Sequence, residues 1–219
     1  MNSLKIIFAG TPDFAVPALQ ALHDKGYEVI GVLTQPDRPS GRGLKLHSSA
    51  IKLKANALGI PVYQPSELKS KASYESLAAI DFNVMIVAAY GLIIPQSILD
   101  LPSFGCFNIH ASLLPRWRGA APIHRAILMG DEVTGVTIMR VVQKLDAGDM
   151  IKKTEIQISE KDTTEQLTKT LAALGAHLMT EVMDELMSKG SLQSIAQDEA
   201  SVTYAEKVTK EESTINWQD

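Results

Sequence analysis

The amino-acid sequence predicts an α/β protein in which helices cover both faces of a doubly wound, mostly parallel sheet. From the N-terminus to about residue 130, short apolar runs alternate with segments whose apolar residues have helical spacing. The apolar runs are nearly continuous, as is typical of parallel strands that are buried on both faces. The 219 residues are enough to enclose a sizeable core in one large domain.

Turn-forming residues divide the first part of the chain into strands and helices. The run LKIIFAG (4–10) has the length and composition of a buried strand, and the helical segment after it ends at Gly26. The stretch PDRPSGRGLKLH (36–47) is a breaker-rich loop, and its length is typical of a functional loop. Strands are expected at 4–10, 27–35, 60–65, 82–91 and 106–112, with helices at 13–26, 48–59, within 67–80 and at 121–131.

The alternation changes after residue 130. Two strands, 134–142 and 150–158, flank the turn-rich loop QKLDAGD (143–149). A long amphipathic helix is expected at about 164–189.

The last thirty residues are polar and irregular, and they contain no segment long enough to form a core. We therefore expect a folded domain at 1–189, followed by a linker at 190–219.

The composition is that of an ordinary globular protein, with 45% hydrophobic and 21% charged residues. A net charge of −4 argues against extensive wrapping of nucleic acid. The single cysteine, Cys106, excludes an intramolecular disulfide and suits a reducing cytosol. The apolar stretch at the N-terminus is too short for a secretory signal or a membrane span, so we expect a cytoplasmic protein without a membrane partner.

Positive charge is concentrated in one segment of the chain. No acidic residue occurs between Asp37 and Glu67. Such a segment either steers a phosphate-bearing substrate or forms an ordinary solvated face, and the solvated face is the commoner explanation. Its basic residues are Arg38, Arg42, Lys45, Lys52 and Lys54.

The turn after the first strand argues against a dinucleotide cofactor. It reads AGTPDFA, with one glycine where the dinucleotide fingerprint has three, and Pro12 lacks the amide that would face a phosphate. A Rossmann-type oxidoreductase is therefore disfavoured.

Asn108 and His110 lie two residues apart in an apolar strand, so both side chains project from the same face of the sheet. Buried amide and imidazole groups require hydrogen-bond partners. The pair either satisfies its own hydrogen bonds or serves as a donor pair for an oxyanion.

Asp146, in the 143–149 loop, either forms an Asx turn or orients and charges the imidazole of His110. With Asn108, the three residues would suit acyl transfer to an amine. Cys106 has the same strand parity, but a lone cysteine in an apolar strand is more often a core residue.

No metal site is expected. The five histidines have no H-x-H or H-x-x-x-H spacing, and Cys106 has no second cysteine to join it. The histidines are His23, His47, His110, His124 and His177.

Two of these segments, FNIHASLLPRWRGAAPI (107–123) and GVTIMRVVQKLDAGDMI (135–151), resemble the 10-formyltetrahydrofolate-dependent formyltransferases. Three further segments resemble the branch of that family that formylates methionyl-tRNA: IIFAGTPDFAVPALQAL (6–22), VLTQPDRPSGRGLKL (32–46) and VAAYGLIIP (87–95). The resemblance covers essentially the whole chain and implies a Rossmann-like formyltransferase fold.

The resemblance also implies a reaction. The amine of methionine on the initiator tRNA would take the formyl group from 10-formyltetrahydrofolate, which serves as a substrate. It implies these roles: Asn108, His110 and Asp146 in catalysis, Ser112, Leu113, Leu114, Pro115, Gly91, Leu92 and Ile93 in folate binding, and Arg42 and Lys45 in tRNA binding.

Members of this family continue into a second, β-rich domain, so residues 190–219 would be the start of the linker to it. We expect a monomer. Two rival functions use the same residues or the same fold. One is formylation of a sugar-nucleotide amine or of glycinamide ribonucleotide. The other is a non-catalytic folate- or RNA-binding module, against which the three polar residues argue.

Overall fold

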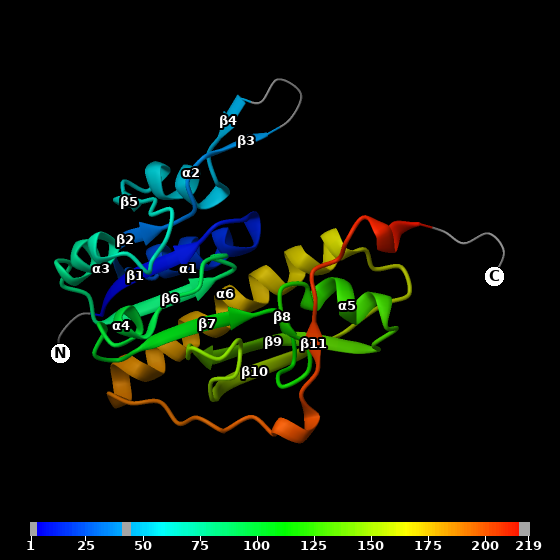
Figure 1. Cartoon of the computed structure of the whole chain (residues 1–219). Helices are drawn as coiled ribbons and strands as arrows, with labels where there is room; N and C mark the ends of the chain where they lie inside the picture. Colours follow the sequence, from blue (N-terminus) through cyan, green and yellow to red (C-terminus); the bar gives the residue numbers. More distant parts are fainter. Residues whose placement is uncertain (1–3, 41–44, 215–219) are drawn as a thin grey trace.

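The computed structural model describes residues 4–40 and 45–214, and a seven-stranded sheet lies at its centre (Figure 1). The strand order is β10–β9–β7–β6–β1–β2–β5. The last five of these are parallel, whereas β9 runs antiparallel to both β7 and β10, so the predicted mostly parallel sheet is confirmed. The strands are β1 (Lys5–Gly10), β2 (Glu28–Leu33), β5 (Val62–Tyr63), β6 (Val84–Ala88), β7 (Cys106–His110), β9 (Val133–Arg140) and β10 (Met150–Gln157).

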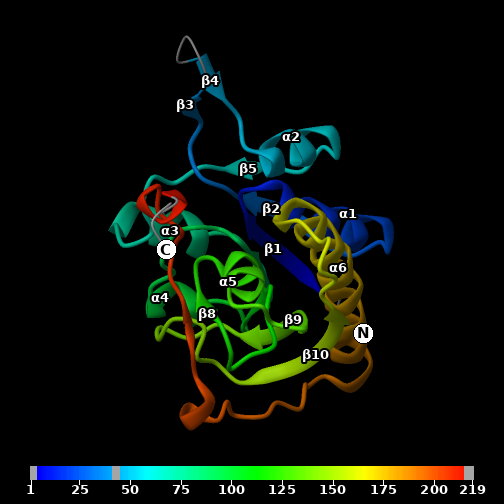
Figure 2. The same cartoon turned by 90° about the vertical axis from the view of Figure 1, so that its right-hand side faces the viewer.

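Helices cover both faces of the sheet, as predicted. Figure 2 shows α1 and α6 together on one side and α3 and α4 on the other. Alternate residues of the strands supply the two apolar clusters between these layers: in β1, Ile6 and Phe8 face α1 and α6, while Ile7 and Ala9 face α3 and α4. The helices are α1 (Val16–Asp24), α2 (Ala50–Ala57), α3 (Lys71–Ala78), α4 (Gln96–Leu99), α5 (Pro122–Leu128) and α6 (Thr164–Lys189).

The long helix α6 supports the strand that carries the polar pair. It begins with a capping box between Thr163 and Gln166 and ends at Gly190, which has a left-handed conformation. Gly175 brings the helix close to β7, because an added Cβ atom there would lie 2.5 Å from Cγ2 of Ile109. The position of β7 therefore depends on a small residue in the middle of the helix.

The segment 36–47 differs from the loop that the sequence predicts. Arg38–Ser40 (β3) and Lys45–His47 (β4) form a two-stranded antiparallel ribbon, with Arg38 opposite His47. This ribbon projects away from the central sheet (Figure 1). The prediction of a loop was wrong for these six residues. Their backbones pair with each other as two antiparallel strands, which the turn-forming residues of the segment did not indicate.

The segment after α6 also differs from the prediction. Residues 191–206, which we call the C-terminal strap, fold back along the molecule (Figure 1). Met150 and Ile195 exchange two backbone hydrogen bonds of 2.8 Å, and β11 (Tyr204–Ala205) pairs in parallel with β8 (Arg118–Gly119). The folded unit thus extends beyond residue 189. The strap is held by backbone pairing and a few buried side chains, so it needs no apolar periodicity and the sequence pattern did not reveal it.

Candidate active site

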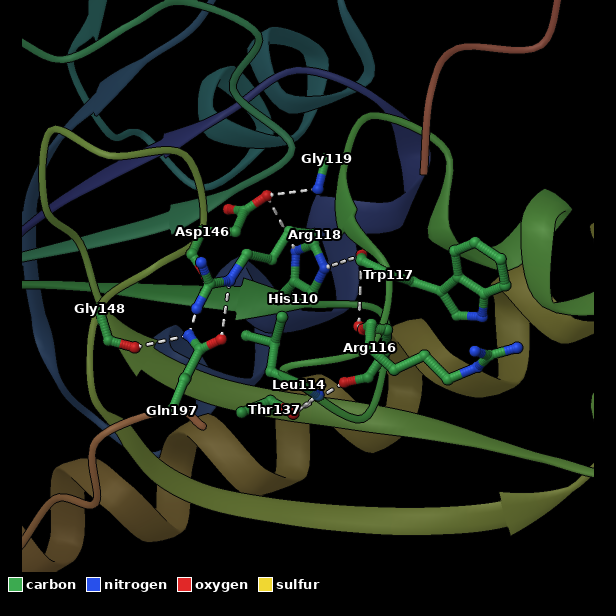
Figure 3. A network of polar contacts seen from close by, with 11 residues as sticks. His110, Leu114, Arg116, Trp117, Arg118, Gly119, Thr137, Asp146, Gly148 and Gln197 are labelled. Carbon is green, nitrogen blue, oxygen red and sulfur yellow. Dashed lines mark hydrogen bonds and ion pairs between the residues drawn. The ribbon is translucent and has the colours of Figure 1, made fainter. Parts of the chain in front are cut away.

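The end of β7 presents Asn108 and His110 on the same face, opposite the face on which Phe107 and Ile109 meet α6. His110 is 5% exposed, and its Nε2 lies 2.8 Å from the carbonyl oxygen of Trp117 (Figure 3). A carbonyl only accepts, so Nε2–H must be the donor. The other ring nitrogen, Nδ1, is therefore the atom that can gain or lose a proton.

Asp146 reaches His110 from the loop between β9 and β10. Its Oδ2 lies 3.7 Å from Nδ1 of His110 and accepts a 2.8 Å hydrogen bond from the backbone N–H of Gly119 (Figure 3). The first distance suits an ion pair but is too long for a hydrogen bond. The carboxylate therefore contacts both the His110 ring and the Gly119 backbone, which lie far from it in the sequence.

Asn108 is half-buried, and its side-chain amide makes no hydrogen bond to any other described residue. It can therefore donate to a bound molecule. Cys106 shares the face but not the chemistry: burial raises the pKa of its thiol to about 12, and Sγ approaches the carbonyl oxygen of Leu99 at 3.8 Å. A thiol in this state is a poor nucleophile.

The loop after β7 is tied to β9 by one threonine. The Thr137 hydroxyl donates to the carbonyl of Ser112 at 2.7 Å and accepts from the N–H of Leu114 at 3.1 Å (Figure 3). Ser112 Oγ donates to the carbonyl of Arg116 at 2.6 Å. The Ser112 and Leu114 side chains are fully buried, so in this structure they shape the loop, while Leu113 and Pro115 keep exposed surface.

The other expected folate-binding segment follows β6. The carbonyl of Tyr90 accepts from the Thr11 hydroxyl at 2.8 Å and from the Gln35 amide at 3.1 Å, so the ends of β1, β2 and β6 are joined here. Gly91 has φ of +83°, and an added Cβ atom would collide with the Gln35 side chain. Leu92 is half-buried and Ile93 is exposed.

The basic segment is only partly described. Arg42 lies outside the described residues, and Lys45 is the first residue of β4. Lys52 forms a 2.7 Å ion pair with Asp37, and this contact lowers the pKa of the Asp37 carboxyl. Part of the positive charge of this segment is thus neutralised within the fold.

Sequence reasoning missed two residues beside Asp146. Arg118 is fully buried: its Nε donates to Oε1 of Gln197 at 2.9 Å and one terminal nitrogen donates to Glu199 at 3.0 Å. The Gln197 amide donates to the carbonyls of Asp146, at 2.8 Å, and Gly148, at 2.7 Å (Figure 3). A buried arginine leaves no signal in a sequence, and Gln197 lies in a segment that the sequence pattern marks as a linker.

Among residues 4–40 and 45–214, no three histidine, cysteine or acidic side chains gather where they could hold a metal ion. No helix in the same ranges has the length and apolarity that a membrane crossing needs.

Comparison with known proteins identifies the family. Residues 4–183 match the formyl transferase family. The chain is 56% identical over 214 residues to a methionyl-tRNA formyltransferase of Methylobacillus flagellatus, and the matched region covers 98% of this chain and 70% of that protein. It is 52% identical to the methionyl-tRNA formyltransferase of Marinobacter nauticus, with 98% and 68% covered.

Solved structures agree on the fold. The phosphoribosylglycinamide formyltransferase of Bacillus halodurans is 28% identical with a TM-score of 0.69, and the match covers 86% of this chain and 97% of that one. The N-formyltransferase of Helicobacter canadensis, solved with folinic acid and dTDP-3-aminofucose, is 18% identical with a TM-score of 0.72, covering 92% and 70%. On sequence similarity and fold together, the chain belongs to the formyltransferase family, within the branch of the methionyl-tRNA formyltransferases.

Proposed function

We propose that this protein transfers the formyl group of 10-formyltetrahydrofolate to the α-amino group of methionine carried by the initiator tRNA. The observation that carries the proposal is the arrangement of Asn108, His110 and Asp146 at the end of β7. The identity of 51–56% to methionyl-tRNA formyltransferases over nearly the whole chain supports this acceptor.

In the proposed mechanism, the neutral amine attacks the formyl carbon directly and a tetrahedral intermediate forms. The free amide of Asn108 and Nδ1–H of protonated His110 donate hydrogen bonds to its oxyanion. Because Nδ1 is 3.7 Å from Asp146, its proton is not already held in a hydrogen bond to that carboxylate and is free to be donated to the oxyanion.

The intermediate then breaks its bond between carbon and N10 of the folate. The amine loses one proton and N10 gains one, so the products are the N-formyl amide and tetrahydrofolate. Nδ1 of His110 is suited to relay this proton, since Nε2 remains bonded to the Trp117 carbonyl throughout. No enzyme nucleophile is needed, in keeping with the raised pKa of Cys106.

We place the folate beside the loops at 91–93 and 112–115, at the carboxyl ends of neighbouring parallel strands β6 and β7. The acceptor end of the tRNA would contact the β3–β4 ribbon and the basic residues Arg42 and Lys45. Changing both residues to alanine should raise KM for the tRNA and flatten its salt dependence, while folate binding stays the same.

The test is a formyl-transfer assay with 10-formyltetrahydrofolate and three acceptors: methionyl initiator tRNA, glycinamide ribonucleotide and a dTDP-linked amino sugar. We expect the highest kcat/KM with the tRNA. A higher kcat/KM with either small amine would overturn the choice of acceptor and support the sugar-nucleotide or glycinamide alternative.

A further inference from the structure

The C-terminal strap contacts the segment that follows β7 and the loop between β9 and β10 that carries Asp146. One end pairs with β10 through Met150 and Ile195, and the other pairs with β8 through Tyr204 and Ala205. Between these anchors the strap passes the loop that carries Asp146. A segment that enters so near the site can set its geometry.

Gln197 is the point of closest contact between the strap and the Asp146 loop. Its side chain is 8% exposed, and the amide nitrogen donates to two carbonyls of the loop, those of Asp146 and Gly148 (Figure 3). These carbonyls flank the turn that aims the carboxylate. Gly148 itself admits no side chain, because an added Cβ atom would collide with the Arg140 carbonyl.

Arg118 determines which way the Gln197 amide points. The buried guanidinium offers only N–H donors, so it requires the amide oxygen to face it, and Nε lies 2.9 Å from that oxygen. The amide nitrogen is thereby directed at the two carbonyls. A side chain with oxygen at both positions could satisfy the arginine but would repel the loop.

The Asp146 loop depends on such external bonds. Asp146 has φ of +45°, a left-handed conformation that a residue with a side chain adopts at a cost unless its surroundings hold it. Its carboxylate is held by the N–H of Gly119, and Gly119 packs against Ala205 of the strap. The strap thus supports Asp146 in two ways. Gln197 holds the backbone carbonyl of Asp146, and Ala205 supports Gly119, whose N–H holds the Asp146 carboxylate.

We propose that Gln197 is a positioning residue for formyl transfer, which holds the Asp146 carboxylate at its place beside His110. This inference rests on the proposed function. It assigns the strap a role in the chemical step, although none of its residues belongs to the proposed catalytic group of Asn108, His110 and Asp146. Without the amide, the Asp146 loop relaxes and the carboxylate moves away from His110.

The test compares Gln197→Glu and Gln197→Met with the same changes at Gln193, an exposed residue of the same strap. Gln197→Glu keeps the acceptor for Arg118 and removes the donors to the loop, whereas Gln197→Met removes all three bonds with little change in volume. Activity is expressed per folinic acid binding site, so that misfolded molecules are not counted. Because a misplacement of about 1 Å can cost about 100-fold, we expect kcat to fall about 10- to 100-fold at position 197, with KM for both substrates within about twofold. The Gln193 variants should match the unmodified chain.

A double-mutant cycle with Asp146→Asn separates positioning from a general structural role. If Gln197 acts through Asp146, then Gln197→Glu lowers single-turnover rates much less in the Asp146→Asn background. An equal loss in both backgrounds would overturn the inference, as would normal kcat in Gln197→Glu and Gln197→Met. Absence of formyl transfer by the unmodified chain would instead count against the proposed function.

Discussion

The strands of the central sheet fall into two groups, which we call the apolar side (β1, β2 and β6) and the polar side (β7 and β9). The two groups are stabilised in different ways. On the side of β1, β2 and β6, strand residues are buried between two apolar clusters, and all five residues of β6 are buried. On the side of β7 and β9, the buried residues include polar side chains that make contacts across long stretches of sequence: His110, Arg118, Thr137 and Gln197. Apolar burial is non-directional, whereas each polar contact has one geometry. We therefore expect changes on the first side to affect stability and changes on the second to affect catalysis.

The largest effect should come from the polar side. His110→Ala and Asn108→Ala each remove one proposed donor to the oxyanion, so kcat should fall about 100- to 1000-fold. Steady-state kinetics and circular dichroism on the same samples would measure activity and folding together. His124→Ala, at an exposed position of α5, is the matched control. Near-normal turnover by folded His110→Ala would end the proposed mechanism.

A core change on the apolar side should behave in the opposite way. Leu19 in α1 is fully buried, so Leu19→Ala should lower the free energy of unfolding by about 2–5 kcal/mol. Denaturant titration measures this loss, and kcat per folded molecule should stay unchanged. A fall in kcat comparable to that of the polar variants would mean that the two sides of the sheet do not differ as described.

Thr137→Val tests the polar side with a side chain of nearly the same shape, because it removes only the hydroxyl's hydrogen bonds. The substitution leaves the Ser112 carbonyl and the Leu114 N–H without their buried partner, which should cost about 1–3 kcal/mol and loosen the loop after β7. We expect a lower kcat as well as a lower unfolding free energy. Thr180→Val is the control, because the buried Thr180 hydroxyl bonds only within α6, to the His177 carbonyl. It should lower stability alone, and equal kinetic losses in the two variants would contradict this reading.

The smallest effect concerns Cys106. Since burial raises the pKa of its thiol to about 12, almost no thiolate forms at pH 8 in the folded protein. Iodoacetamide should therefore leave Cys106 unmodified at pH 8, and it should react readily once denaturant exposes the side chain. Mass spectrometry measures the modified fraction. Rapid alkylation of the folded protein would show that the strand end is more open than its burial indicates.

The positions of several residues of the candidate site could be predicted because they follow a local sequence pattern. Asn108 and His110 share strand parity, and β7 has the extended geometry that makes parity meaningful. The distance of 3.7 Å between Asp146 and His110, and the choice of Nδ1 as the exchangeable nitrogen, could not be predicted. Both depend on the loop between β9 and β10 and on the Trp117 carbonyl, whose positions come from contacts far along the chain.

The sequence by itself determined the mostly parallel sheet, the helices on both faces and the long helix at Thr164–Lys189, because apolar periodicity and capping residues act over a few neighbours. Only the tertiary structure decided that the strap folds back, that Arg118 is buried, and that Gln197 meets the Asp146 loop. The contacts of Gln197 with Arg118 and with the Asp146 loop join residues about 50 to 80 positions apart through one or two hydrogen bonds each. A single directional bond leaves no periodic trace in a sequence, and only the folded chain brings its two partners together.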